Sequence, residues 1–334
     1  MPPTSDVTAA CPVCGSTRLS TTGRVTSQDA ALHFCAREDA HRFAQLCDSI
    51  ETLWGRTAAD LHMCGDCHFG FAWPYVAGDA DYYRLAYERA QYPADKWDYD
   101  RAGQALDALP APTRVLEIGA GFGHFLDRVR ARVPGVEVVA TEYGEPARDV
   151  LTAKGYDVRP LDVRSLDEGP FDLICAFQVV EHLDGLDRLG ATLHRLLTPG
   201  GHVLVAVPNT ERIAFDEARG SLLDMPPNHI GRWSREAFET FAADHDLDLV
   251  AFDHEPHVMR AYVRTDIAYS YARRAQVPGT VPHWSAGLRQ RRFGKALGML
   301  VALLRAPVRI PVWIEAARRD DLGSSSFAVL RRAA

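Results

Sequence analysis

The sequence lacks long hydrophobic runs, an excess of positive charge and a leader-like N-terminus. Its longest apolar stretch, ALGMLVALL at 296–304, is about half the ~18 residues that a membrane-spanning helix needs. The net charge is −7, whereas a general nucleic-acid-binding protein usually carries a basic excess. The opening MPPTSDVTAACPVCG has no basic region followed by an apolar stretch. We therefore expect a cytoplasmic protein with no stable membrane insertion and no nucleic-acid partner.

Internal repeats and low-complexity segments are also missing, so the chain is not expected to be a repeat array or a disordered tail. Its 334 residues suffice for one large domain or two ordinary ones. Apolar residues make up 47% of the chain and charged residues 24%, which allows a normal packed core.

Three regions differ in pattern. Residues 1–75 are rich in cysteine, histidine and glycine and show little periodicity, and residues 76–110 look like a helical cover or linker with many aromatic side chains. Residues 111–334 alternate between strand-like and helix-like segments, with a long insertion at 257–321 in which 285–314 carries basic but no acidic residues. Ser234 is expected to cap a helix.

Seven segments of the third region read as strands, and short helices separate most of them. This alternation predicts an α/β fold with a doubly wound, mostly parallel seven-stranded sheet. The strand-like segments are RVLEIG, VEVVATE, YDVRPLDV, FDLICAFQ, HVLVAVP, LDLVAFDH and SSSFAVLRRA.

A glycine turn follows the first of these strands, in VLEIGAGFGHF at 115–125. In open parallel sheets, ligands bind beyond the carboxyl ends of the strands, which is where this turn lies. A dinucleotide fingerprint would read G-x-G-x-x-G. Gly119 and Gly121 fit that pattern, but its third position is His124, and Gly123 comes one residue early.

The G-x-G-x-G spacing after Glu117 resembles motif I of the class I S-adenosylmethionine-dependent methyltransferases. Further elements of that family follow in order over roughly 110–255, including FQVVEHL at 177–183 and LLTPGGHVLVAVPN. The resemblance implies a Rossmann-like methyltransferase fold, an acid at Glu142 that binds the ribose hydroxyls, and Asp162 near the adenine amino group. The cofactor-binding residues that it implies are Glu117, Gly119, Gly121, Gly123, Glu142, Tyr143, Asp162, Val163, Gln178, Tyr83 and Tyr87.

Four of the seven cysteines form two CxxC pairs, Cys11 with Cys14 and Cys64 with Cys67. Four thiolates satisfy a tetrahedral zinc ion, and a closed shell of four indicates a structural site. The layout resembles the N-terminal zinc-binding segment of some methyltransferases, including sugar C-methyltransferases of natural-product pathways. Alternatively, some or all of these thiols are unliganded, or other residues of the intervening segment compete as ligands: His33, Cys35, His41 and Cys47.

Two of the 13 histidines stand out by position. His182 follows the fourth strand, and His229 lies in MPPNHIGRWS, a segment that resembles a stretch of the same methyltransferases. Histidine is the usual base near neutral pH, so both are candidates for the catalytic residue. Each could instead make only structural contacts, and Glu181 either orients His182 or is merely a charge at a helix start.

The sequence thus predicts a zinc-containing, S-adenosylmethionine-dependent methyltransferase that methylates an O or C atom of a small biosynthetic intermediate, such as a sugar or secondary-metabolite scaffold. An N-methyltransferase, a macromolecule methyltransferase, a nicotinamide oxidoreductase and a regulatory protein that only senses the cofactor stay open as alternatives. A homodimer is a possible assembly. The basic stretch 285–314 is expected to form an amphipathic helix packed on the domain. Alternatively, it binds an anionic substrate such as a nucleotide-linked sugar, touches an anionic membrane surface or forms a dimer face.

Overall fold

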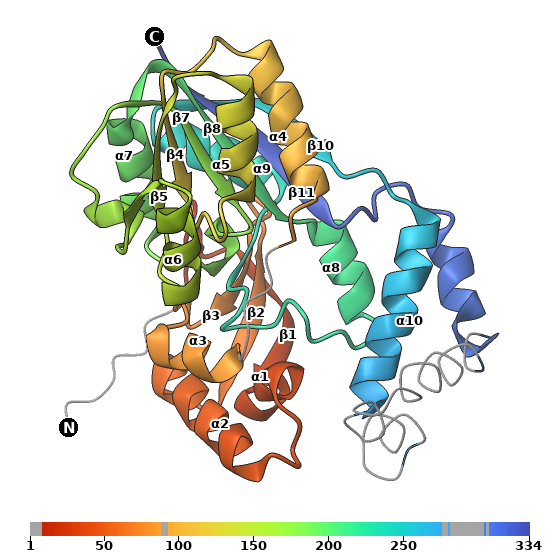
Figure 1. Ribbon diagram of the computed structural model, residues 1–334. Coiled ribbons are helices and arrows are strands. Elements are labelled where there is room, and N and C mark those ends of the chain that lie inside the picture. Colours follow the sequence, from red (N-terminus) through yellow and green to blue (C-terminus); the bar gives the residue numbers. More distant parts are fainter. Residues whose placement is uncertain (1–8, 88–92, 276–279, 281–303, 305–306) are drawn as a thin grey trace, which may run out of the picture.

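The computed structural model describes residues 9–87, 93–275, 280, 304 and 307–334. Two β-sheets organise this part of the chain (Figure 1). A seven-stranded sheet forms the upper part of the view, and a four-stranded sheet lies below it with the N-terminal helices.

The large sheet has the strand order β10-β11-β8-β7-β4-β5-β6. Neighbours from β8 to β6 pair in parallel, whereas β11 pairs antiparallel with both β8 and β10. The predicted doubly wound, mostly parallel sheet is therefore confirmed. Its strands are β4 (Arg114–Ile118), β5 (Glu137–Thr141), β6 (Asp157–Arg159), β7 (Phe171–Phe177), β8 (Leu197–Pro208), β10 (Leu247–His254) and β11 (Ser325–Arg332).

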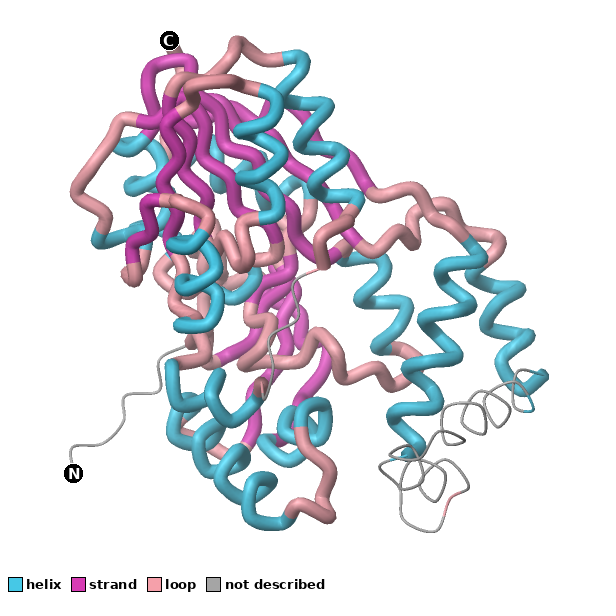
Figure 2. Tube along the Cα trace, in the orientation of Figure 1, coloured by secondary structure: helices cyan, strands magenta, loops and turns pink. Residues whose placement is uncertain are grey.

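Helices cover both faces of this sheet (Figure 2). Side chains of a strand alternate between the faces, so Val115 of β4 packs with α4 (Trp97–Ala108) and α5 (His124–Arg132). Leu116, one position on, packs with α7 (Leu186–Leu196) and α9 (Arg235–Asp244) on the other face. Each fully buried Leu, Val or Phe in these layers contributes roughly 1.5–3 kcal/mol.

The smaller sheet joins distant parts of the chain. Its order is β1 (Leu19–Thr26), β2 (Ala58–Cys64), β3 (Gly70–Trp73) and β9 (Gly231–Arg232). The last pairing is antiparallel, with Gly70 opposite Arg232. Helices α1 (Ser27–Phe34), α2 (Ala40–Trp54) and α3 (Ala80–Ala86) pack beside this sheet around a core of their own. The sequence patterns did not predict this sheet.

Helices α8 (Thr210–Glu217) and α10 (Met259–Ala275) stand to one side of the large sheet (Figure 1). Helix α10 begins the segment between β10 and β11, and a further helix over 307–316 packs with it and α8. Of the basic stretch 285–314, most lies outside the described residues. Within the described ranges, no helix has both the length and the apolar content to cross a membrane.

Several local predictions can be compared with the structure. Ser234 caps α9, because its hydroxyl accepts a hydrogen bond from the backbone N–H of Ala237. The remaining helix, α6 (Glu145–Ala153), follows β5 as expected. The described residues of 76–110 include helices α3 and α4. Strand β8 begins at Leu197, five residues before the predicted strand-like segment HVLVAVP. Cys175 of β7 is fully buried in the core.

Candidate functional site

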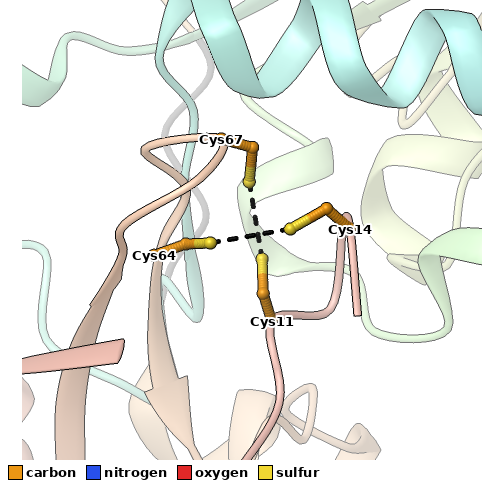
Figure 3. Close-up of side chains that lie close together, drawn as sticks. All are labelled: Cys11, Cys14, Cys64 and Cys67. Carbon is orange, nitrogen blue, oxygen red and sulfur yellow. Dashed lines mark hydrogen bonds between the residues drawn. The ribbon is translucent and has the colours of Figure 1, made fainter. Parts of the chain in front are cut away.

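The four cysteines of the two CxxC pairs converge on one point (Figure 3). The sulfur atoms of Cys11 and Cys67 are 3.5 Å apart, as are those of Cys14 and Cys64, and all four lie within 4.8 Å of one another. Tetrahedral zinc with Zn–S bonds of about 2.3 Å needs sulfur atoms about 3.8 Å apart. The four thiols therefore fit a zinc ion with a closed shell.

The backbone around the sulfurs also suits a thiolate cluster. Three of the four cysteines are buried, and the backbone N–H of Asp66 points at the sulfur of Cys64, 3.4 Å away. Across the knuckle, Asp66 pairs with Arg18. None of the competing ligands His33, Cys35, His41 and Cys47 joins the group among the described residues.

The cysteine cluster is tied to the segment that carries His229. Strand β3 begins three residues after Cys67 and pairs with β9, which begins two residues after His229. In addition, the hydroxyl of Ser234 donates to the carbonyl of Cys67, and the N–H of Ala72 donates to the carbonyl of Ile230. The two segments therefore share one small sheet, although about 160 residues of chain separate them.

The glycine turn lies at the carboxyl end of β4, as predicted. Gly119, Gly121 and Gly123 all have positive φ, between 52° and 73°, a conformation that other residues adopt only at a cost. The turn is also crowded, because a Cβ on Gly119 would lie 2.8 Å from Cγ2 of Val179. The N–H groups of Gly119 and Ala120 donate to the carbonyl of Thr141 at the end of β5.

Two acidic side chains flank this turn. Glu142, at the end of β5, is 8% exposed and accepts hydrogen bonds from the backbone N–H groups of Gly121 at 2.8 Å and Gly144 at 2.7 Å. Glu117 is 2% exposed, and one of its carboxylate oxygens has no partner among the described residues. Burial raises the pKa of Glu117 well above its usual value. An oxygen that already accepts one bond can accept another, so Glu142 keeps the capacity to bind a ligand hydroxyl.

The other predicted cofactor residues of the main domain are distributed along the same edge of the sheet. Asp162 caps the short 3₁₀ helix Val163–Ser165 and pairs with Arg164 at 2.5 Å. Desolvation raises the pKa of Asp162, but its bonds to Arg164 outweigh this and leave the pKa lowered. Val163 is buried in the core, and Tyr143 is 65% exposed.

Gln178 directly follows β7 in a strained conformation with φ of 59°. Its side-chain amide donates to the carboxylate of buried Asp98 and to the hydroxyl of Ser325, both at 3.3 Å. Non-glycine residues with positive φ are uncommon and occur often at functional sites. The ligand-binding roles of Gln178 and of the residues above stay predictions.

His182 and His229 lie side by side, with ring centroids 4.7 Å apart. Nδ1 of His182 lies 2.5 Å from the carbonyl oxygen of Asn228, and Nδ1 of His229 lies 2.8 Å from a carboxylate oxygen of Asp224. Since a carbonyl and a carboxylate can only accept, both Nδ1 atoms carry protons. When the ring is neutral, its Nε2 therefore has a lone pair that can accept a proton or bind a ligand.

Glu181 completes this cluster. It lies with His182 in the 3₁₀ helix Val180–His182, is 1% exposed, and has neither carboxylate oxygen hydrogen-bonded within the described part of the chain. One of its oxygens is 3.9 Å from Nε2 of His182. We call Glu181, His182 and His229 the histidine cluster; one ligand atom from each lies within 4.8 Å of the others.

Burial and neighbouring charges shift the pKa of each member. Burial, reinforced by the charge of His229, lowers the pKa of His182 to about 3. Burial alone would lower the pKa of His229, but the bond to Asp224 and the charges of Asp224 and Glu181 leave it raised. Burial raises the pKa of Glu181 to about 7.

Two tyrosine side chains from the N-terminal region lie against the histidine cluster and the loop beside it. The hydroxyl of Tyr83, on α3, is 3.3 Å from Nδ1 of His182, and the hydroxyl of Tyr87 donates to the side-chain oxygen of Asn228 at 2.8 Å. The structure thus places both predicted cofactor tyrosines beside the two predicted catalytic histidines, while Tyr87 is still 42% exposed.

Two residues of the site were missed by the sequence patterns. Asp224 and Asn228 hold the two histidines, but neither belongs to a regular strand or helix. Asp224 stands five residues before His229, in the same loop as the proline pair. An acid close to a candidate histidine is the signal that could have identified it.

A cavity of about 500 Å³ lies between α8 and α10, and Leu223, the neighbour of Asp224, forms part of its lining. Its arginines are paired with carboxylates: Arg212 with Asp216, Arg219 with Glu315 and Arg309 with Asp266. Because these charges are balanced, the cavity is not a strong candidate for an anion site.

The structure thus combines a glycine turn at the edge of a doubly wound sheet with the histidine cluster beside it. Over residues 85–251, half of the chain, the sequence matches the family model described as a methyltransferase domain. The chain therefore belongs to this methyltransferase domain family and has its Rossmann-like fold, as predicted. The four cysteines precede the matched range.

The demethylmenaquinone methyltransferase of Thermus thermophilus is 32% identical to this chain over 133 residues, which cover 37% of the chain and 59% of the relative. The ubiquinone biosynthesis O-methyltransferase of Pseudomonas aeruginosa is 27% identical over 165 residues, covering 42% of the chain and 68% of the relative. The match thus spans less than two thirds of the Thermus protein. The solved O-methyltransferase of a Brevibacillus brevis trans-AT PKS multienzyme, in complex with S-adenosyl-L-homocysteine, overlaps 70% of this chain and 72% of its own, with 14% identity and a TM-score of 0.42.

Proposed function

We propose that this protein is an S-adenosylmethionine-dependent methyltransferase that acts on an O or C atom of a small biosynthetic intermediate, with a sugar or secondary-metabolite scaffold as the expected acceptor. The observation that carries the proposal is the contact between the glycine turn and the segment before the histidine cluster. Val179, which touches Gly119, is separated from Glu181 by a single residue. A cofactor in the turn would therefore present its methyl group close to the two histidines.

The chain's own residues supply the binding chemistry. The turn glycines admit a nucleoside close to the backbone, and Glu142, already oriented by two backbone bonds, accepts from ribose hydroxyls. Glu117 offers a carboxylate to the positively charged end of the ligand. The same carboxyl edge of the large sheet carries the candidate contacts of the adenine and the amino-acid portion, which are Tyr143, Asp162, Val163 and Gln178.

The reaction is a displacement at the sulfonium methyl. The acceptor gives up a proton, its oxygen or carbon forms a bond to the methyl carbon, and the carbon–sulfur bond breaks to leave S-adenosylhomocysteine as a neutral thioether. Holding the reacting atoms about 3–3.5 Å apart supplies much of the rate. His182 and His229 assist the deprotonation of the acceptor, and Asp224 and Asn228 hold their rings.

The zinc ion of this proposal belongs to the four-cysteine cluster and has a structural role. With all four positions filled by sulfur, no position is left for a substrate. It would hold Cys11 and Cys14 onto the hairpin of β2 and β3, and so stabilise the small sheet that carries the loop of His229.

Transfer of a labelled methyl group from S-adenosylmethionine tests the proposal. The full chain is incubated with a panel of hydroxylated small molecules, nucleotide-linked sugars and amines, and separately with bulk RNA and protein. We expect labelled product with a small molecule that bears an acidic hydroxyl or carbon. Labelling confined to RNA or protein, or to amines, would contradict the assigned acceptor class.

A further inference from the structure

The histidine cluster combines three residues of two metal-ligand types, one buried carboxylate and two partly buried imidazoles. Two imidazoles and one carboxylate, each with a donor atom within 4.8 Å of the others, form this group. It lies apart from the cysteine cluster and shares no residue with it. Two histidines and one carboxylate form a donor set that binds divalent first-row transition metals and leaves other coordination positions open.

The orientation of both rings is the first argument for a metal. Metal-binding histidines almost always donate their second ring N–H to a carboxylate or a backbone carbonyl, which fixes the ring and its tautomer. Here Nδ1 of His229 faces the carboxylate of Asp224 at 2.8 Å, and Nδ1 of His182 faces the carbonyl of Asn228 at 2.5 Å. Both partners are the expected ones, and both leave Nε2 as the ligand atom.

The state of Glu181 is the second and independent argument. A buried carboxylate without a partner is costly, yet Glu181 is 1% exposed and neither of its oxygens accepts a hydrogen bond among the described residues. Nε2 of His182 lies 3.9 Å from one of these oxygens, too far for a hydrogen bond. A divalent cation between these atoms would supply the missing partner.

The distances are compatible with a shared ion. Nitrogen and oxygen ligands of zinc lie about 2.0–2.2 Å from the metal, so two ligands of one ion are at most about 4.4 Å apart. The separation of 3.9 Å between Glu181 and His182 already meets this limit. All three ligand atoms lie within 4.8 Å of one another, a bound that exceeds the same limit by only a few tenths of an ångström.

We propose that Glu181, His182 and His229 bind a catalytic divalent transition-metal ion, which in turn binds the oxygen of the acceptor. This inference rests on the proposed function and makes oxygen the methylated atom. Metal coordination lowers the pKa of a bound hydroxyl, so the hydroxyl proton leaves to solvent, and the oxygen then takes the methyl group as the carbon–sulfur bond breaks. The two histidines thus assist deprotonation as ligands.

The test is a calorimetric titration of the full chain, already carrying one equivalent of zinc at the cysteines, with further zinc. Zinc is chosen because it binds imidazole and carboxylate ligands and has no redox chemistry. Two variants remove one ligand each: Glu181→Gln, of the same size, and His229→Asn, whose amide can replace Nδ1 at Asp224 but not Nε2. The control is Glu117→Gln, which changes another buried carboxylate outside the cluster.

The wild type and Glu117→Gln are expected to take up a second equivalent with the same affinity. Both ligand variants are expected to lose at least about 100-fold, since removal of only an outer partner of a ligand typically costs about 10–100-fold. Circular dichroism checks that the variants fold. No second zinc site in the wild type, or equal affinity in Glu181→Gln, would overturn the proposal.

A parallel titration with S-adenosylhomocysteine separates this inference from the proposed function. Binding of the nucleoside without a second zinc would overturn the metal site alone. A second zinc site without nucleoside binding would support the metal site and count against the methyltransferase proposal.

Discussion

The cysteine cluster, formed by Cys11, Cys14, Cys64 and Cys67, differs from the histidine cluster in the type and the number of its candidate ligands. The first has four soft thiols, draws its ligands from two hairpin-like knuckles and can fill every position of a tetrahedral ion. The second has two imidazoles and one carboxylate, lies next to the glycine turn, and would leave coordination positions open on the ion that we propose there. Because β3 and β9 join them in one small sheet, the first is expected to govern stability and the second reactivity.

The largest effect is expected from Cys67→Ser. Loss of a zinc ligand should release the metal and lower the free energy of unfolding by about 4 kcal/mol or more, as losses of structural metals do. Metal analysis and denaturant unfolding measure both quantities. Cys47→Ser changes a cysteine outside the cluster and should retain the zinc. If Cys67→Ser kept full zinc and full stability, the cysteine cluster would not be structural.

Removal of Nε2 from the histidine cluster should affect turnover with little loss of stability. His229→Asn can keep the bond to Asp224, so its melting temperature should stay near that of the wild type. The methyl-transfer rate should fall by about 10²–10⁴-fold, the usual contribution of assistance to proton removal. The rate is measured on whichever acceptor the wild type methylates. An unchanged rate would remove His229 from the reaction.

Gly119→Ala tests whether the nucleoside binds at the glycine turn, which lies beside the histidine cluster. A Cβ there would meet Val179 at 2.8 Å, in a backbone conformation with φ of 66°. Strain of about 1–2 kcal/mol predicts about 5–30-fold weaker binding of S-adenosylhomocysteine. Gly135→Ala is the matched control, since its φ is 83° but nothing lies within 4 Å of its added Cβ. Equal affinity in the two variants would place the nucleoside elsewhere.

Tyr87→Phe tests the contact between the N-terminal region and the loop of Asn228 and His229. We expect it to have the smallest effect of these variants. The change deletes the hydrogen bond to Asn228, which is worth about 0.5–1.5 kcal/mol. Thermal unfolding should therefore show a small loss of stability, with zinc content unchanged. A loss as large as that of Cys67→Ser would mean that the two regions do not differ as described.

Local patterns were enough to predict the large sheet, because most of its strands contain apolar runs, such as those of β7 and β8, that helices and turn residues separate. The glycine turn was also identifiable, since only glycine suits three positive φ angles in five residues. The small sheet was not predictable in this way. Strand β9 is two residues long and pairs with β3 across about half of the chain, so no local periodicity marks it.

The candidate site was predictable only in its outline. Both CxxC pairs and both histidines were identified from spacing and position, and the structure brings each set together. The role of Asp224 and Asn228 depends on how one irregular loop folds back on the 3₁₀ helix of His182. Such contacts have no periodic signature. Glu181 was singled out for its neighbour, whereas its burial without a hydrogen-bond partner became visible only in three dimensions.

The most direct test of the whole account is a calorimetric comparison of S-adenosylhomocysteine with NAD on the purified chain. The glycine turn, with Gly123 one residue before the place of the third dinucleotide glycine, should bind the homocysteine nucleoside and show no measurable heat with NAD. Saturable binding of NAD, without any uptake of S-adenosylhomocysteine, would contradict the account at its foundation.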